Sequence, residues 1–167
     1  MAEPGWIETQ VRGLRIAENT RNPVVILQEV EGERMLPIYI GHPEASAIAM
    51  TLAGRKFERP LTHDLMRLIL EGLQASLQRV AVTELRTNTF YAKLVLERDH
   101  EIVSVDARPS DSIALALRMG APIFVAEGLL REPGSEGREP GMPDRQEDVK
   151  RLRDYLEGMN PEDFGGV

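Results

Sequence analysis

The chain has 167 residues, a length that suits one domain and a tail, and its net charge is −7. It contains no cysteine, which excludes disulfides, thiolate zinc sites and cysteine nucleophiles and suits the cytoplasm, where we expect the protein to act. No apolar run approaches the roughly 20 residues that span a bilayer, and we expect neither a secretion signal nor a membrane partner.

The charge is unevenly distributed along the chain. Residues 1–130 hold 14 basic and 17 acidic side chains, whereas residues 131–167 hold 6 and 10. This balance argues against tight, indiscriminate binding to a phosphate backbone, which depends on clustered Lys and Arg. It leaves room for a local basic groove on the nearly neutral body.

The first part of the chain predicts three strands followed by a helix. Residues 6–17 form an uneven strand pattern, residues 24–28 an apolar run of buried-strand length, and residues 35–40 a third strand after a hairpin loop. Pro37 offers no N–H, so we expect one side of the third strand to be an edge or a bulge. Residues 43–54, rich in small and apolar side chains and ending in glycine, predict a helix.

Residues 62–77 predict a second helix. Its apolar residues recur at i, i+3, i+4 and i+8, the pattern of an amphipathic helix. Four side chains fall on this face: Leu65, Leu68, Ile69 and Leu73.

The remainder of the body repeats the order of the first part. Further elements are predicted as strands at 79–85, 89–96 and 102–105, a helix at 109–120 and a short strand at 122–125. When residues 11–54 are moved forward by 66 positions, Ser46 falls on Ser112 and Gly54 on Gly120. The sequence therefore predicts an α+β fold of duplicated βββα units that share a mostly antiparallel sheet, with helices packed on it.

Residues 131–143 are dense in Gly, Pro and charge, which predicts a flexible linker between a domain of residues 1–130 and a tail of residues 144–167. The tail predicts an amphipathic C-terminal helix that docks on the body or on a partner. Its apolar stripe consists of Val149, Leu152, Leu156 and Met159.

Three predicted helices open with polar segments, 41-GHPEAS-46, 59-RPLTHDL-65 and 108-RPSDSI-113. A helix start presents unpaired N–H groups and the positive end of the helix dipole, so it can bind an anion such as phosphate. Each segment taken alone also has an ordinary explanation. Proline, nearby acids and a capping hydroxyl, here Thr62 or Ser110, are usual at helix N-termini.

Two features favour chemistry at these segments. Arg59 and Arg108 each precede a proline, which holds the backbone extended, and a guanidinium group beside a helix start suits phosphate. His63 adjoins Asp64, and histidine can move a proton near neutral pH while carboxylates can bind Mg²⁺ or Mn²⁺. Phosphodiester hydrolysis uses these parts, provided that the helix starts converge in space.

Other chemistries find little support. The sequence has no GxGxxG, Walker, HExxH or GxSxG motif, and we expect no organic cofactor. Phe90 and Tyr91 could stack on bases, although Phe90 is better explained as a core residue.

Several segments occur together in an order that resembles the bifunctional nuclease family over roughly residues 10–130. They are 36-LPIYIG-41 with 44-EASAIA-49, 59-RPLTHDL-65, 89-TFYAKL-94, 105-VDARPSDSIALALR-118 and 122-PIFV-125. The resemblance implies a compact α+β domain that self-associates and a nuclease that acts on both RNA and DNA, as attributed to plant members. The family's polar positions correspond here to Glu44, Arg59, Thr62, His63, Asp64, Asp106, Arg108, Ser110 and Asp111.

The resemblance brings no catalytic assignment, so the expected roles are our own. The first hypothesis is a metal-assisted phosphodiesterase acting on RNA or single-stranded DNA. The catalytic residues would be His63, Asp64, Asp111 and Glu44. The nucleic acid would be bound by Arg59, Thr62, Arg108 and Ser110. A Mg²⁺ or Mn²⁺ ion would be held by Asp64, Asp106 and Asp111.

Two alternatives stay open. The chain could be a non-catalytic regulatory module whose helix starts hold a small anion or a partner's acidic segment, which its acidic charge favours. Both Arg-Pro segments could instead be structural, with Arg59 and Arg108 buried against nearby carboxylates.

Overall fold

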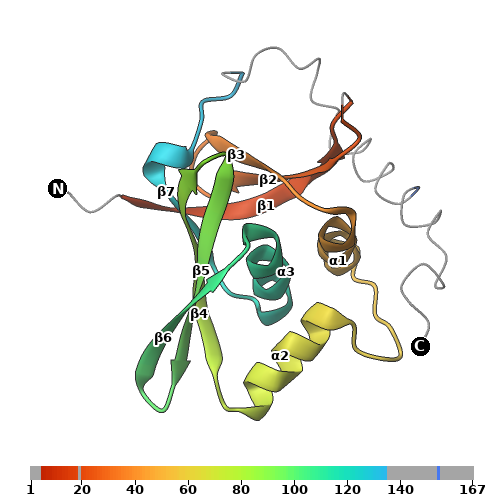
Figure 1. Cartoon of the computed structure of the whole chain (residues 1–167), viewed down its shortest axis with the longest axis vertical. Coiled ribbons are helices and arrows are strands. Elements are labelled where there is room, and N and C mark those ends of the chain that lie inside the picture. The colour runs from red at the N-terminus through yellow and green to blue at the C-terminus, as the bar shows by residue number, and fades with distance from the viewer. Residues whose placement is uncertain (1–4, 19, 135–153, 155–167) are drawn as a thin grey trace.

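The computed structural model describes residues 5–18, 20–134 and 154. Within them, seven strands form one sheet, and three α-helices lie together on one side of it (Figure 1). The strands are β1 (Trp6–Ile16), β2 (Pro23–Glu29), β3 (Met35–Tyr39), β4 (Ser76–Arg86), β5 (Thr89–Arg98), β6 (Glu101–Ala107) and β7 (Ile123–Ala126). The helices are α1 (His42–Leu52), α2 (Thr62–Gly72), α3 (Pro109–Met119) and the short 3₁₀ helix η1 (Glu127–Leu129).

The strands follow the spatial order β3-β2-β1-β7-β4-β5-β6. All neighbours are antiparallel except β4 and β7, which are parallel. The predicted α+β fold with a mostly antiparallel sheet is confirmed. β7 joins the two halves, because it pairs with β1 from the first half and β4 from the second.

The duplication is visible in the order of the elements. The units β1-β2-β3-α1 and β4-β5-β6-α3 have the same order, and α2 lies between them in the chain. A matching hydrogen bond closes the first turn of each unit's helix. The Ser46 hydroxyl donates to the His42 carbonyl at 2.9 Å, and the Ser112 hydroxyl donates to the Arg108 carbonyl at 2.9 Å.

β3 has the edge position that Pro37 predicted. It lies at one end of the sheet, and Pro37 is opposite Ile26 of β2. On the other side of β3, Met35 forms an isolated bridge with Arg131. A proline is tolerated here because the ladder requires no N–H from it on the edge side.

α2 is shorter than the predicted helix of residues 62–77. It ends at Gly72, Gln74 has a φ of 57°, and β4 begins at Ser76. A left-handed residue cannot continue a helix, and Ser76 and Leu77 pair with β5 instead. The apolar stripe therefore extends just beyond the helix, to the residue that caps its C-terminus.

α3 lies at the centre of the helical layer. It contacts α1 on one side and α2 on the other, and it packs against β4 and β5. Its fully buried residues include Ile113, Ala114 and Leu115, which belong to the main hydrophobic core. This central position brings the N-terminal ends of the three helices close together.

α2 presents most of its predicted apolar stripe to solvent. Met66 and Leu70 pack partly against the core, on the side that faces α3. The four stripe residues are between 43% and 51% exposed: Leu65, Leu68, Ile69 and Leu73. Amphipathicity correctly predicted this helix, although a large part of its apolar surface is left uncovered.

Two further expectations concern other parts of the chain. None of the described helices is long and apolar enough to cross a membrane. The predicted linker beyond Gly134 and the predicted C-terminal helix fall outside the described residues, apart from Asp154.

Candidate active site at the helix N-termini

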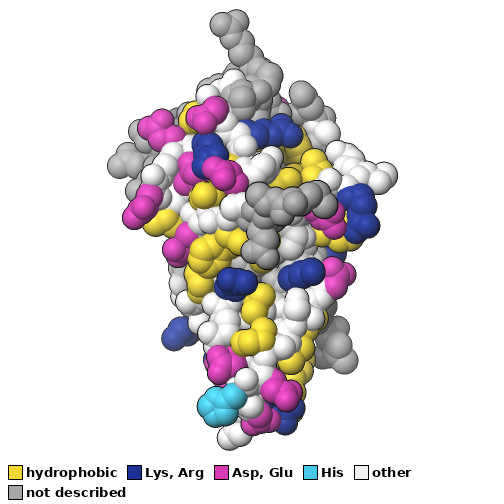
Figure 2. Space-filling view, turned by 90° about the vertical axis from the view of Figure 1, so that its left-hand side faces the viewer, with side chains coloured by type: hydrophobic (Ala, Val, Ile, Leu, Met, Phe, Trp, Pro, Cys, Tyr) yellow, Lys and Arg dark blue, Asp and Glu magenta, His cyan; other side chains and the backbone are white. Residues whose placement is uncertain are grey.

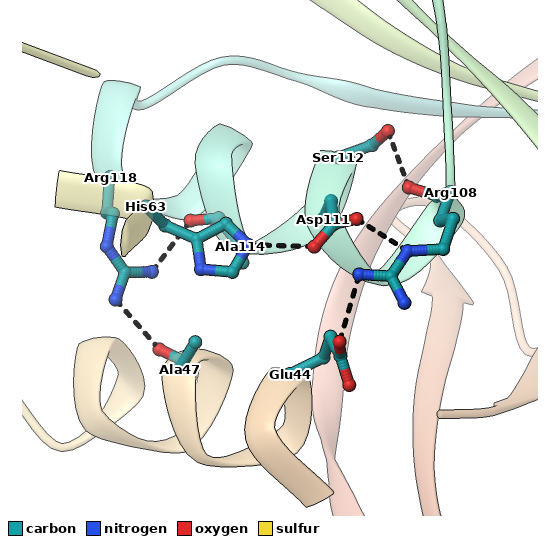
Figure 3. A network of polar contacts seen from close by, with 8 residues as sticks. All are labelled: Glu44, Ala47, His63, Arg108, Asp111, Ser112, Ala114 and Arg118. Carbon is teal, nitrogen blue, oxygen red and sulfur yellow. Dashed lines mark hydrogen bonds and ion pairs between the residues drawn. The ribbon is translucent and has the colours of Figure 1, made fainter. Parts of the chain in front are cut away.

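Residues from all three helices meet in one polar network (Figure 3). His63 Nε2 of α2 lies 2.9 Å from Asp111 Oδ1 of α3. Arg108, which precedes α3, donates from Nε to Asp111 Oδ2 at 2.7 Å and from Nη2 to Glu44 Oε1 of α1 at 2.9 Å. We call these four residues the His63–Asp111 network. The two Arg-Pro segments therefore contribute neighbouring side chains, as the first hypothesis required.

The local backbone explains the position of Arg108. It is the N-cap residue of α3 with extended backbone, at φ −68° and ψ 143°, and Pro109 follows it. The N-caps are therefore Arg108 and, for α2, Leu61, rather than the expected hydroxyl residues Ser110 and Thr62. Neither N-cap side chain accepts a hydrogen bond from its own helix, because these hydroxyls lie inside the first turn, one or two positions too late to act as N-cap.

Asp111 is held ionised in this network. Burial raises its pKa, but hydrogen bonds from Arg108 and His63 outweigh that effect and hold the pKa below its usual range. An ionised carboxylate can only accept a hydrogen bond, so His63 Nε2 carries the proton that it shares with Asp111. In the neutral ring, the other nitrogen, Nδ1, has the lone pair that can accept a proton.

Exposure differs strongly across the network. The side chain of His63 is 9% exposed, those of Glu44 and Asp111 are 15% and 25% exposed, and that of Arg108 is 65% exposed. The hypothesis that Arg108 is buried as a structural anchor is therefore wrong. Arg108 is the part of the network that a ligand in solution would meet first.

Asp64 belongs to a second network, centred on Arg118. Arg118 Nε donates to Asp64 Oδ1 at 2.7 Å, and its Nη2 donates to the carbonyl of Ala47 in α1 at 3.1 Å. The N–H of Leu61 donates to Asp64 Oδ2 at 3.0 Å. Burial raises the pKa of Asp64, and the bonds from Arg118 and Leu61 reverse this and lower it. Asp64 thus fixes the start of α2 beside His63.

Arg118, whose side chain is only 7% exposed, was not among the residues predicted from the sequence. It stands in the last turn of α3, where a basic residue is commonly explained by the helix dipole. Its position four residues after Ala114, whose carbonyl it also binds at 2.9 Å, was visible in the sequence. Its partners on two other helices were not.

Four expected site residues lie outside both networks. Arg59 is exposed and forms no ion pair within the described part of the chain. Thr62 is exposed, and Ser110 is buried at 7% exposure. Asp106 lies opposite Lys93 in the β5–β6 ladder.

The alternation of β5 places Asp106 away from the helices. Ala92 and Leu94 are buried toward the core, so Lys93 between them faces the other side of the sheet. Directly opposed residues in an antiparallel ladder share a face. Asp106 therefore points away from the side that carries Asp64 and Asp111.

These positions do not fit the expected divalent cation. Both oxygens of Asp111 are bound by His63 and Arg108, and both oxygens of Asp64 by Arg118 and Leu61. Among the described residues, no group of three His, Asp or Glu side chains is arranged to hold a metal ion. Because guanidinium groups neutralise the carboxylates, we derive no catalytic step through a metal.

The aromatic pair on β5 gives little support to base stacking. Phe90 packs partly against the main core, as expected. The ring of Tyr91 is covered by the guanidinium of Arg86, whose central carbon lies 4.4 Å from the ring centre. A base would have to displace this contact to stack on Tyr91.

Comparison with known proteins places the chain in a family. The bifunctional nuclease domain matches residues 25–137, which include most of β2, every later strand, all three α-helices and both networks. The chain belongs to the bifunctional nuclease domain family. The resemblance seen in the sequence is thereby confirmed.

Relatives of two kinds accompany this match. Uncharacterized proteins from two strains of Mycobacterium tuberculosis are 40% identical over 162 residues, which cover 94% of this chain and 97% of theirs. Bifunctional nuclease 1 of Oryza sativa subsp. indica is 23% identical over 138 residues, and Bifunctional nuclease 1 of Arabidopsis thaliana is 24% identical over 139. The matched part covers 80% and 81% of this chain, but only 42% and 43% of these plant relatives.

Proposed function

We propose that this chain is a nuclease that hydrolyses phosphodiester bonds in RNA or single-stranded DNA through the His63–Asp111 network. The observation that carries the proposal is the 2.9 Å contact between His63 Nε2 and Asp111 Oδ1, made beside the exposed guanidinium of Arg108. A histidine oriented by a carboxylate is a standard arrangement for general acid–base catalysis. Membership of the bifunctional nuclease domain family supports the same substrate class.

The proposed chemistry uses groups that the network leaves available. His63 Nδ1 accepts a proton from an attacking water molecule as the water oxygen bonds to phosphorus, and the bond from phosphorus to the leaving oxygen breaks. The leaving oxygen is protonated by the histidinium or by solvent. Arg108 uses Nε and Nη2 for the carboxylates of Asp111 and Glu44 (Figure 3). In this scheme its Nη1 faces a phosphate oxygen. Glu44 and Asp111 keep that guanidinium in place.

A nuclease assay on labelled single-stranded RNA and DNA tests the proposal. We expect the wild-type chain to cut at least one of them, and His63→Gln and Asp111→Asn to lose roughly 10²-fold or more of that activity. Arg98→Gln, at an exposed site on β5 outside both networks, is the control purified in the same way. Cleavage by folded His63→Gln at the wild-type rate would contradict the assigned role.

The same assay separates metal-dependent from metal-free cleavage. Parallel reactions contain a chelator, Mg²⁺ or Mn²⁺. Because the carboxylates are neutralised by arginine, we expect cleavage in the chelator to match that in either metal. Cleavage that requires Mg²⁺ or Mn²⁺ would instead support the metal-assisted hypothesis drawn from the sequence.

A second candidate function is a non-catalytic module that binds a small anion or an acidic protein segment. The charged groups of the two networks are paired with one another, and this pairing leaves few of them free for catalysis. The exposed guanidinium of Arg108 could still bind an anion. In that case neither RNA nor DNA is cut, and Arg108→Gln weakens binding of the anion or acidic segment. We also propose, from family membership and the absence of cysteine, that the chain self-associates and acts in the cytoplasm.

A further inference from the structure

Among the helices that the structure describes, α2 exposes the most apolar surface outside the core. Leu65, Ile69 and Leu73 are each about half exposed, and Leu68 is 43% exposed. These residues recur with helical spacing along the side of α2 that faces away from α3, while Met66 and Leu70 face inward. We call the four exposed residues the α2 face. α2 already packs against α3 and still has a second, exposed apolar side. An exposed apolar side of this kind indicates an interaction surface.

The α2 face carries no charge. The charged residues of the helix lie beside it, and each is paired within the chain: Arg67 Nη1 contacts Glu71 at 2.8 Å, and Asp64 binds Arg118. By helical spacing, the residues that complete the exposed side are Thr62 and Gly72. A Cβ built on Gly72 would meet nothing within 4 Å, so the surface is low at this point and open to a close neighbour.

A second copy of the same chain fits this surface best. A two-fold contact places each patch against itself, so any net charge on the patch would repel its twin. The chain carries a net charge of −7, so two copies repel each other over most of their surface. At the neutral α2 face they can approach without bringing like charges together. An acidic or basic partner would find no complementary charge there.

We propose that two copies of this chain pair through their α2 faces around a two-fold axis. In this arrangement the helices cross with Leu68 and Ile69 near the axis, and Leu65 of one copy packs toward Leu73 of the other. The helix of 11 residues is about 16 Å long, so the contact lies at the small end of stable interfaces, and the dimer dissociates on dilution. The proposal specifies the surface of the self-association proposed above and does not depend on nuclease activity.

Molar mass in solution tests the pairing. The chain has a mass of 18.7 kDa, so we expect light scattering after size exclusion to show a species approaching twice that value as concentration rises toward about 0.2 mM. Ile69→Glu and Leu65→Glu should give the monomer mass throughout. Val30→Glu, at an equally exposed apolar residue in the β2–β3 turn, is the matched control and should keep the dimer.

A crosslink provides an independent measurement, because it detects the dimer directly and does not rely on a variant that loses it. The chain has no cysteine, so Ile69→Cys introduces a single thiol. Near a two-fold axis this thiol meets its twin, and mild oxidation should give a disulfide-linked dimer on a non-reducing gel, whereas Val30→Cys should remain mainly monomeric. Circular dichroism checks that each variant is folded.

Each outcome of these experiments either supports the proposed dimer or overturns it. A concentration-dependent dimer lost in folded Ile69→Glu, together with the Ile69→Cys crosslink, supports the proposal. A wild-type chain that stays monomeric to about 0.2 mM overturns it. So does a dimer that survives Ile69→Glu but is lost when Leu152 and Leu156 of the tail are changed to Glu, because assembly would then depend on the tail. None of these results bears on whether the chain cuts RNA.

Discussion

Arg118 joins three helices through one guanidinium group. Its Nε binds Asp64 at the start of α2, its Nη2 binds the Ala47 carbonyl in α1, and its Nη1 binds the Ala114 carbonyl in its own helix α3. The planar fork of arginine can serve three acceptors in fixed directions, which an ammonium group cannot do. Arg118 therefore fixes the start of α2 relative to α1 and α3, and His63, next to Asp64, depends on that position to reach Asp111.

We expect Arg118→Met to lower the free energy of unfolding by about 2–3 kcal/mol, because it leaves the partly buried carboxylate of Asp64 without its charged donor and removes two further bonds to carbonyls. Arg118→Lys should fall between wild type and Arg118→Met, since it keeps the charge but not the fork. Urea unfolding measures both. Arg98→Met, which removes an exposed pair with Asp99, should change stability by less than about 1 kcal/mol. Equal stabilities of Arg118→Met and Arg98→Met would show that Arg118 does not stabilise the helical layer.

The residues of the site could be predicted from the sequence more fully than their partners. The polar helix starts indicated His63, Asp111 and Arg108, because capping positions and charges are local features. The contact between His63 and Asp111 joins positions 48 residues apart, and nothing local specifies it. Arg118 was missed for the same reason, since its function lies in contacts to other helices.

At the scale of elements, two of the turns between neighbouring strands share one backbone geometry. The β4–β5 turn contains Thr87 and Asn88 at φ 48° and 58°, and the β5–β6 turn contains Asp99 and His100 at φ 52° and 65°. Two consecutive residues with positive φ are the mark of a type I′ turn, whose twist matches the flanking strands. Threonine is a poor residue for this conformation because its branched Cβ opposes positive φ.

Replacing Thr87-Asn88 by Asn-Gly should therefore raise the free energy of unfolding by about 1 kcal/mol, since this pair is the preferred type I′ sequence. Thermal or urea unfolding provides the measurement. The control is Thr89→Asn on β5, where the backbone is extended and where we expect a small loss of stability. If the two changes had the same effect, strain in the turn would not be the cause.

The elements themselves followed from periodicity, with one informative difference. Alternation and apolar runs located the strands, and glycine located the ends of α1 and α3, where Gly54 and Gly120 both have a φ of 66°. For α2 the apolar pattern continues through Leu77, although the chain turns at Gln74. Leu77 is apolar because it enters the core from β4, so one pattern covered two elements.

For the whole molecule, the ionised carboxylates between the helices couple stability to pH. Asp64 and Asp111 both have pKa values lowered in the folded chain, so the folded state binds their protons less readily than the unfolded state. Their contribution is complete above the unfolded pKa of about 4 and is lost as pH falls through the lower folded pKa values.

We expect the free energy of unfolding to fall as pH is lowered from about 5 to about 2, and to fall less steeply in Asp64→Asn and Asp111→Asn. Each variant should be less stable than wild type at neutral pH, because it loses a charge-assisted bond, and the difference should narrow in acid. Urea titrations at several pH values give the slopes. Parallel slopes for wild type and both variants would contradict this account.

The position of β7 determines when the sheet can be completed during synthesis of the chain. β7 pairs with β1, and the Thr9 hydroxyl donates to the carbonyl of Ile123, 114 residues further along the chain. As the nascent chain leaves the ribosome, β1 emerges early and must wait for β7 before its second edge is closed. Until then a strand edge stays open to misplaced neighbours. Newly synthesised protein should therefore be most vulnerable to aggregation, and most in need of a chaperone, just before residues 123–126 emerge.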